Sequence, residues 1–184
     1  MAKVHARQGK TSEHYTPAQY VEAARAVLDG VIDLDPASCD VANATVKATR
    51  FFTRVENGLL LPWGVERRYG TLDHRGSTVF VNPPYSDYRG QASAWAQKLL
   101  MEYDLGCVHA AVMLVNATML YHLPFQELMK RGAVCITDHR IRFVSAVTGL
   151  PQDQPPQPNA FIYVGPNVNR FGSYFAEFGV VMEY

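Results

Sequence analysis

The sequence predicts an α/β fold in which helices cover both faces of a doubly wound sheet. Short apolar runs typical of strands alternate along the chain with segments whose apolar residues recur every three or four positions, as in helices. One run, residues 110–115 (AAVMLV), is continuously apolar, as strands buried on both faces of a parallel sheet are. This alternation favours strands joined by right-handed helical crossovers.

The composition is that of an ordinary globular protein. Of the 184 residues, 48% are hydrophobic, and 17 basic side chains balance 17 acidic ones. We expect a flexible basic tail over residues 1–12 and one domain over 13–184. The three cysteines lack the spacing of a metal site, so no metal is expected. Residues 1–10 lack the apolar core of a signal peptide, and no run reaches membrane-spanning length. A cytoplasmic protein without a membrane partner is therefore predicted; its oligomeric state stays open.

The first expected elements lie before residue 54. Thr16 has the character of a helix N-cap, with Pro17 at the first helical position and Gln19 completing a capping box, and Gly30 ends this helix. Three further elements follow: a strand at 31–35 (VIDLD), a helix at 37–48 and a strand at 50–53.

The remaining elements surround a polar loop at 64–77 and a Pro- and Gln-rich loop at 145–159. A helix after residue 90 carries one apolar stripe, formed by Ala92, Trp95, Ala96, Leu99, Leu100 and Tyr103. A second helix is expected near Pro124. The strands are expected at 78–81, 110–115, 133–137, 160–165 and 180–184.

Polar residues end two of the predicted strands. Asp33 and Asp35 end the strand at 31–35, and Asn82 follows the strand at 78–81. In doubly wound sheets the ligand binds outside the carboxyl ends of the strands, where the strand order reverses. These residues are therefore candidates for one site, although a pair of solvated strand-end acids is the alternative for Asp33 and Asp35.

The segment Asn82-Pro83-Pro84-Tyr85 forms a stiff corner after its strand. Neither proline can donate to a sheet ladder, and each fixes its own φ. The side-chain oxygen of Asn82 and the backbone carbonyl of Pro83 are two acceptors suited to an amine with two N–H groups, and Tyr85 offers a face for stacking. Accepting both N–H groups would stabilise positive charge on that nitrogen as it attacks an electrophile. A loop that merely contains two prolines is the alternative.

NPPY resembles the signature of amino-group methyltransferases that use S-adenosylmethionine. Taken with YTP (15–17), DLDPAS (33–38), ANA (42–44), NGL and PW (57–63), MLVNAT (113–118) and HRIRF (139–143), the chain resembles the phage-type Dam family of DNA N6-adenine methyltransferases from about residue 14 to about residue 164. The resemblance implies a Rossmann-like class I methyltransferase sheet, a catalytic domain over 13–184, and a phage- or prophage-encoded enzyme in the cytoplasm of a bacterial host.

The resemblance also implies S-adenosylmethionine as cofactor and double-stranded DNA as partner. The cofactor would lie against Tyr15, Thr16, Pro17, Asp35, Pro36, Ala37 and Asn57, with Glu56 as an alternative to Asn57 for the acid that the family often has there. Asn82, Pro83 and Pro84 would hold the amine of an extruded adenine, and Tyr85 would stack on its ring. The expected DNA contacts are Arg67, Arg68, Arg75, Tyr88, Arg89, Arg140 and Arg142.

Three readings of the function remain open from the sequence. Methylation of RNA or of a protein glutamine through the same corner is an alternative to DNA methylation, and a catalytically silent nucleic-acid-binding module is another. The balanced charge does not by itself indicate nucleic-acid binding. The chain leaves no room for a separate recognition domain, so we expect a short recognition sequence read by the loops at 64–77 and 145–159. A solvated loop is the alternative for 64–77, and a disordered insertion is the alternative for 145–159.

Overall fold

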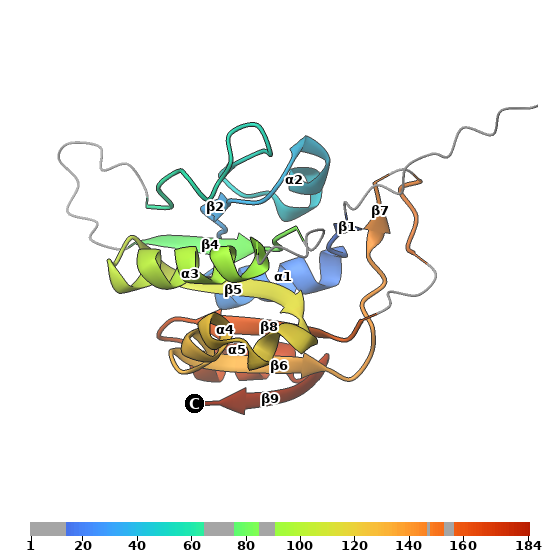
Figure 1. Ribbon diagram of the computed structural model, residues 1–184. Coiled ribbons are helices and arrows are strands. Elements are labelled where there is room, and N and C mark those ends of the chain that lie inside the picture. Colours follow the sequence, from blue (N-terminus) through green and yellow to red (C-terminus); the bar gives the residue numbers. More distant parts are fainter. Residues whose placement is uncertain (1–13, 65–75, 85–90, 147, 153–156) are drawn as a thin grey trace, which may run out of the picture.

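The computed structural model describes residues 14–64, 76–84, 91–146, 148–152 and 157–184 (Figure 1). The expected basic tail and most of the loop at 64–77 lie outside the described residues. Within them, no helix is long and apolar enough to cross a membrane.

A mixed sheet of seven strands forms the centre of the described structure (Figure 1). Its strands lie in the order β3-β2-β4-β5-β8-β6-β9. Their bounds are β2 Leu34–Asp35, β3 Arg50–Phe51, β4 Ser77–Val81, β5 Val108–Asn116, β6 Gly132–Thr137, β8 Asn159–Val164 and β9 Gly179–Glu183. The four strands β3, β2, β4 and β5 are mutually parallel, whereas β8 is antiparallel to both of its neighbours and β9 is antiparallel to β6.

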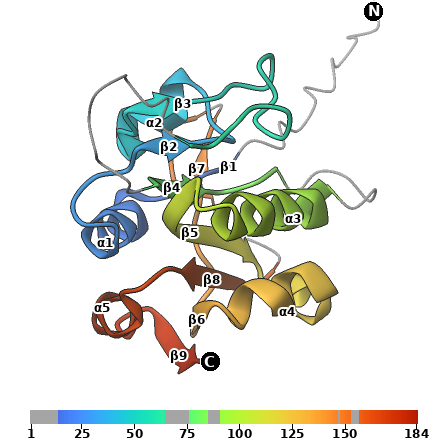
Figure 2. The ribbon, with the colours of Figure 1, turned by 90° about the vertical axis from the view of Figure 1, so that its left-hand side faces the viewer.

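Helices cover both faces of this sheet, as the sequence predicts (Figure 2). On one face lie α1 (Ala18–Val27), α2 (Asp40–Val46) and α5 (Val168–Phe175), which pack with Phe80, Phe161 and Tyr163 of the strands. On the other lie α3 (Gln91–Asp104) and α4 (Leu123–Met129), which pack with Val79, Val81 and Ile162. Neighbouring residues of one strand thus point to opposite faces, and both faces are apolar because both are covered.

The antiparallel strand β8 departs from the simple winding that the sequence favours. The chain leaves β6 at its carboxyl end and enters β8 at the same edge of the sheet, since Ile136 pairs with Ala160. A parallel neighbour would need a crossover that carries the chain back to the opposite edge, usually a helix. Between β6 and β8 the described residues contain no helix, so β8 must run antiparallel.

A second, two-stranded sheet joins β1 (His14–Tyr15) to β7 (Val144–Ser145) in antiparallel register, with Tyr15 opposite Val144. The sequence does not predict this pairing. Figure 1 shows both strands beyond the carboxyl end of β6, at the edge where the parallel strands end. The short helix η1 (Ala117–Tyr121) follows β5 at that edge too.

Candidate functional site

The strand order reverses between β2 and β4, which are neighbours in the sheet. The chain continues from β2 through α2 to β3 on one side, and from β4 through α3 to β5 on the other. Asp35 is the last residue of β2, and Asn82 directly follows β4. Because the two strands are parallel, both residues lie at the same edge of the sheet. The prediction that these strand ends come together is confirmed, and the point where they meet is the usual ligand position in such sheets.

Asp35 ends β2, Asp33 directly precedes that strand, and the two aspartates have different surroundings. The Asp33 carboxylate accepts hydrogen bonds from the backbone N–H of Thr78, at 2.8 Å, and from the Thr78 hydroxyl, at 2.9 Å. Asp33 therefore fastens β2 to β4. Asp35 is buried, and its carboxylate accepts the backbone N–H of Ala37 at 3.2 Å. Of the two acids, Asp35 is the one at the carboxyl end of β2.

Burial raises the pKa of Asp35 to about 6, and the nearby Ser38 side chain and the hydrogen bond from the Ala37 backbone N–H oppose part of that rise. A carboxyl group with this pKa is mostly ionised at pH 7, so the site holds a negative charge with little solvent around it. A cationic group bound next to Asp35 would stabilise that charge. Strongly shifted carboxyl groups of this kind are typical of functional sites, although ion-pair networks produce them too.

The loop after β3 lies directly against the turn that follows Asp35. A Cβ atom at Gly58 would overlap the backbone carbonyl of Pro36, so only glycine allows this approach. The indole N–H of the fully buried Trp63 donates to the Gly58 carbonyl at 2.8 Å and anchors the loop from the other side. Gly58 was not predicted as a site residue, although it lies in the NGL segment.

Because Gly58 lies against Pro36, the preceding residue, Asn57, is held near the turn that follows Asp35. It is exposed, its φ is +56°, and its side-chain oxygen accepts the backbone N–H of Leu59 at 3.3 Å. Glu56, the alternative acid, turns its carboxylate onto its own loop, where it accepts the Thr53 N–H at 2.8 Å. The structure therefore brings Asn57 near the predicted cofactor residues and ties Glu56 into the fold of the loop.

The corner after β4 begins with the half-buried Asn82, followed by the buried Pro83 and the exposed Pro84. The side-chain nitrogen of Asn82 donates a hydrogen bond to the hydroxyl oxygen of Thr16 at 3.2 Å. The nitrogen end of the amide is thus turned towards Thr16. Tyr85, the last residue of the predicted corner, lies outside the described residues.

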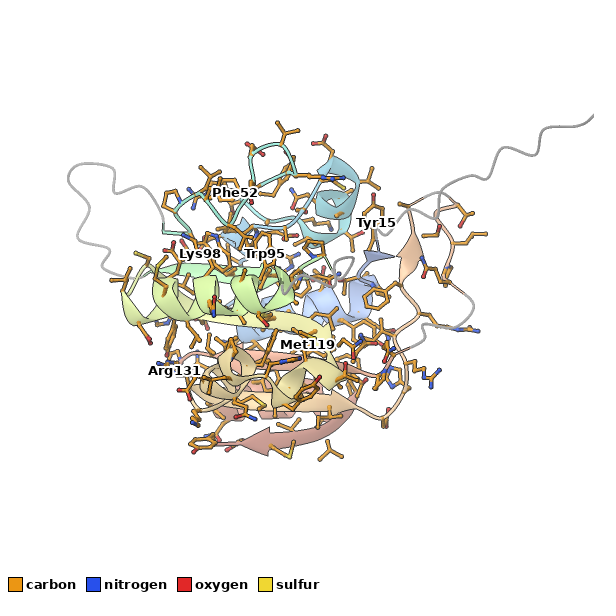
Figure 3. All side chains as sticks on the ribbon, in the orientation of Figure 1. Tyr15, Phe52, Trp95, Lys98, Met119 and Arg131 are labelled. Atoms are coloured by element: carbon orange, nitrogen blue, oxygen red, sulfur yellow. The ribbon has the colours of Figure 1, made fainter. Side chains whose placement is uncertain are left out.

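The segment of Tyr15 and Thr16 bridges the two strand ends. While Thr16 contacts Asn82 after β4, the Tyr15 hydroxyl accepts a hydrogen bond from the thiol of Cys39 at 3.5 Å. Cys39 is the N-cap of α2, the helix that follows Asp35, and Figure 3 shows Tyr15 beside that helix. Cys39 was not predicted as a site residue, because a lone cysteine before a helix carries no distinctive sequence signal.

The predicted capping role of Thr16 is wrong. The N-cap of α1 is Pro17, whose side chain makes no capping hydrogen bond, and the helix begins at Ala18. Thr16 is buried, and its hydroxyl faces Asn82 across the sheet edge instead. A tertiary contact has overridden the local capping pattern.

Arg140 and Arg142 are exposed on the segment that leaves β6. Because β5 and β6 both run antiparallel to β8, β6 ends at the same edge as β4 and β5. The segment is fastened by His139, whose ring nitrogens lie 2.6 Å from the hydroxyl of Tyr20 in α1 and 2.6 Å from the carboxylate of Asp138. The other predicted DNA contacts (Arg67, Arg68, Arg75, Tyr88 and Arg89) lie outside the described residues.

Within the described ranges, no three His, Cys, Asp or Glu side chains are grouped so that they could hold a metal ion. The sequence matches no known family model and no curated protein. The assignment of a function therefore rests on the residues and their geometry.

Proposed function

We propose that this protein is a DNA methyltransferase that transfers a methyl group from S-adenosylmethionine to the N6 amine of adenine, on a Rossmann-like class I methyltransferase sheet. The observation that carries the proposal is the convergence of Asp35 and Asn82 at neighbouring strand ends, with Tyr15 and Thr16 bridging them. Three segments far apart in the sequence, each expected from the resemblance to contribute to one site, meet at this edge.

The topology supports the finer fold assignment. A parallel half-sheet with helices on both faces and a reversal of strand order between β2 and β4 is the arrangement of Rossmann-like folds. Beyond β5 the sheet continues with β8, β6 and β9, which run in mixed directions. These strands do not alter the reversal of strand order between β2 and β4.

The residues around Asp35 fit the chemistry of the proposed cofactor. S-Adenosylmethionine, when bound, supplies a methyl group on a positively charged sulfur, and it carries an ammonium group as well. The buried carboxylate of Asp35 suits a cationic ligand, and the half-buried phenol of Tyr15 and the hydroxyl of Thr16 add polar partners. Pro36 and Ala37 would form an apolar floor, with Asn57 at the far side.

The corner after β4 fits the acceptor amine. The Asn82 side-chain oxygen and the Pro83 carbonyl would each accept one N–H of the adenine amine and hold its lone pair in a fixed direction. Positive charge develops on this nitrogen as it gains the methyl group, and two prearranged acceptors stabilise that charge more than the neutral amine. The amine would itself be the nucleophile, so no side chain has to act as one. The methyl–sulfur bond would break as the methyl–nitrogen bond forms, S-adenosylhomocysteine would leave as the thioether, and the surplus proton would pass to solvent.

Exposed cations at the same edge favour DNA over a small amine as the acceptor. Arg140 and Arg142 are exposed on the segment that leaves β6, where they would contact DNA phosphates, and a base in duplex DNA would have to be extruded to reach Asn82. Stacking of that base on Tyr85, and reading of a short sequence by the loops at 64–77 and 145–159, complete the proposal.

The proposal is tested by methyl transfer from labelled S-adenosylmethionine to duplex DNA, RNA and protein acceptors, followed by digestion of the DNA with nucleases sensitive to adenine methylation. We expect labelling of duplex DNA by the wild type, near-complete loss in Asn82→Ala, and wild-type labelling in Asn169→Ala, an exposed asparagine of α5. Labelling of RNA alone or of protein alone would show that this molecule, and not DNA, is the methyl acceptor. Cofactor binding without any transfer, unchanged in Asn82→Ala, would instead favour a silent binding module.

A further inference from the structure

We propose that Thr16 is a positioning residue that sets which end of the Asn82 amide faces the substrate. Its hydroxyl oxygen accepts the side-chain N–H of Asn82 at 3.2 Å. The inference rests on the function proposed above, in which the oxygen of Asn82 accepts a hydrogen bond from an amine. It gives Thr16 a role beyond the cofactor contact that the resemblance implies.

The orientation of this amide matters because its two ends have opposite chemistry. The oxygen end accepts hydrogen bonds and the nitrogen end donates them. An amine that presents N–H groups can be held only by the oxygen end, and an amide turned by half a rotation would bring donor against donor. The two ends are nearly equal in size, so packing discriminates poorly between them. A threonine hydroxyl can accept a hydrogen bond from the nitrogen end or donate one to the oxygen end, and in the structure it is the nitrogen end that lies against Thr16. The contact with Thr16 engages the nitrogen end and directs the oxygen end away from Thr16.

Thr16 is itself held firmly enough to serve as a reference point. It is 7% exposed, and a β-branched side chain has restricted rotation about χ1. Before it, Tyr15 pairs with Val144 in the β1–β7 sheet and its hydroxyl contacts Cys39 at 3.5 Å. After it, Pro17 has a fixed φ and is the N-cap of α1. The hydroxyl is thus fixed relative to both strand ends.

The alternative, that Thr16 contacts only the cofactor, makes a different kinetic prediction. Loss of a cofactor contact weakens cofactor binding and leaves the rate at saturation unchanged. Loss of a positioning contact lowers kcat, because fewer molecules present the oxygen of Asn82, and leaves cofactor affinity nearly unchanged. The bond to Asn82 therefore predicts an effect on kcat.

The kinetic test compares Thr16→Val, which removes the hydroxyl with little change of shape, with Thr16→Ser, which keeps it. We expect Thr16→Val to lower kcat about five- to tenfold, the size of one ordinary hydrogen bond. The KM for S-adenosylmethionine should stay within about twofold of the wild-type value, and Thr16→Ser should restore most of kcat. Thr16→Ala replaces Thr16→Val if the valine variant does not fold. A raised KM for the cofactor with unchanged kcat would overturn the proposal.

A spectroscopic readout makes the test independent of turnover. The side-chain NH₂ signals of Asn82, identified in ¹⁵N-labelled protein by their loss in Asn82→Asp, should shift and exchange faster in Thr16→Val but not in Thr16→Ser. Unchanged signals in Thr16→Val would refute the positioning role, whatever the activity. If the signals change as expected but the wild type methylates no acceptor, the proposed function is wrong. The positioning role would then be wrong too, although the hydrogen bond between Thr16 and Asn82 would be confirmed.

Discussion

The carboxylate of Asp33 accepts two hydrogen bonds from Thr78, one from the backbone N–H and one from the hydroxyl, at 2.8 and 2.9 Å. The pair joins the residue before β2 to the second residue of β4, on the amino-terminal side of the two strand ends that form the candidate site. Asp33 thus belongs to the framework below the candidate site, whereas Asp35, two residues further on, lies at the strand end that forms it.

Asp33→Ala is expected to lower the free energy of unfolding by about 1–3 kcal/mol, because it leaves the backbone N–H of the buried Thr78 without this acceptor, while the Thr78 hydroxyl keeps the Val31 carbonyl. The affinity of the folded protein for S-adenosylmethionine should change little. Urea denaturation and calorimetric titration measure the two quantities, with Glu177→Ala, at an exposed carboxylate, as the control. A large loss of affinity without a loss of stability would place Asp33 in the binding site.

Asp35→Asn is expected to stabilise the fold at neutral pH while weakening cofactor binding. Burial raises the pKa of Asp35 from 3.8 to about 6, so the folded state prefers the protonated form. Its contribution to stability is therefore lost as the pH rises from about 4 to about 6, and the loss amounts to about 3 kcal/mol above that window. Asparagine carries no charge at any pH and keeps an acceptor for the Ala37 N–H.

Urea denaturation of the wild type and Asp35→Asn across pH 4 to 8 measures this effect. We expect the advantage of the variant to be smallest near pH 4 and to grow until about pH 7, while its affinity for S-adenosylmethionine falls at least tenfold at pH 7.5. A stability difference that does not vary with pH would show that Asp35 is not a buried ionised group.

Gly58→Ala is expected to destabilise the protein and to weaken cofactor binding together. The added Cβ overlaps the Pro36 carbonyl, so either the loop carrying Asn57 or the turn after Asp35 must move. Overpacking of this kind costs about 1–3 kcal/mol. Gly172→Ala is the matched control: it lies in α5, where a Cβ meets only an ordinary contact with Glu183, and alanine there should stabilise by about 0.5–1 kcal/mol. Unchanged stability in Gly58→Ala would contradict the close approach.

Arg140→Ala and Arg142→Ala are expected to weaken DNA binding to a similar extent for different sequences, since phosphate contacts do not read bases. Each lost phosphate contact should reduce the slope of log affinity against log salt by about 0.9. Fluorescence anisotropy at several salt concentrations measures this slope. Arg170→Ala serves as the control, because Arg170 lies on α5 and pairs with Asp29 at 2.6 Å. An unchanged slope in both variants would exclude these arginines from the DNA interface.

The sequence alone determined the order of most strands and helices and the end of β4. Pro83 and Pro84 have no backbone N–H to donate, so the ladder had to stop near Asn82 wherever the strand was placed. The apolar stripe from Ala92 to Tyr103 likewise specified which side of α3 would be buried, because helical spacing is a local property.

The tertiary structure decided the partners of the site residues. Thr16 and Asn82 are 66 positions apart, and the pairing of their side chains depends on how α1 and β4 are brought together. The distinction between Asp33 and Asp35, the close approach of Gly58 to Pro36 and the antiparallel course of β8 depend in the same way on distant segments. Periodicity and turn chemistry act over a few residues, whereas a hydrogen bond between distant segments forms only where the packed sheet brings their atoms together.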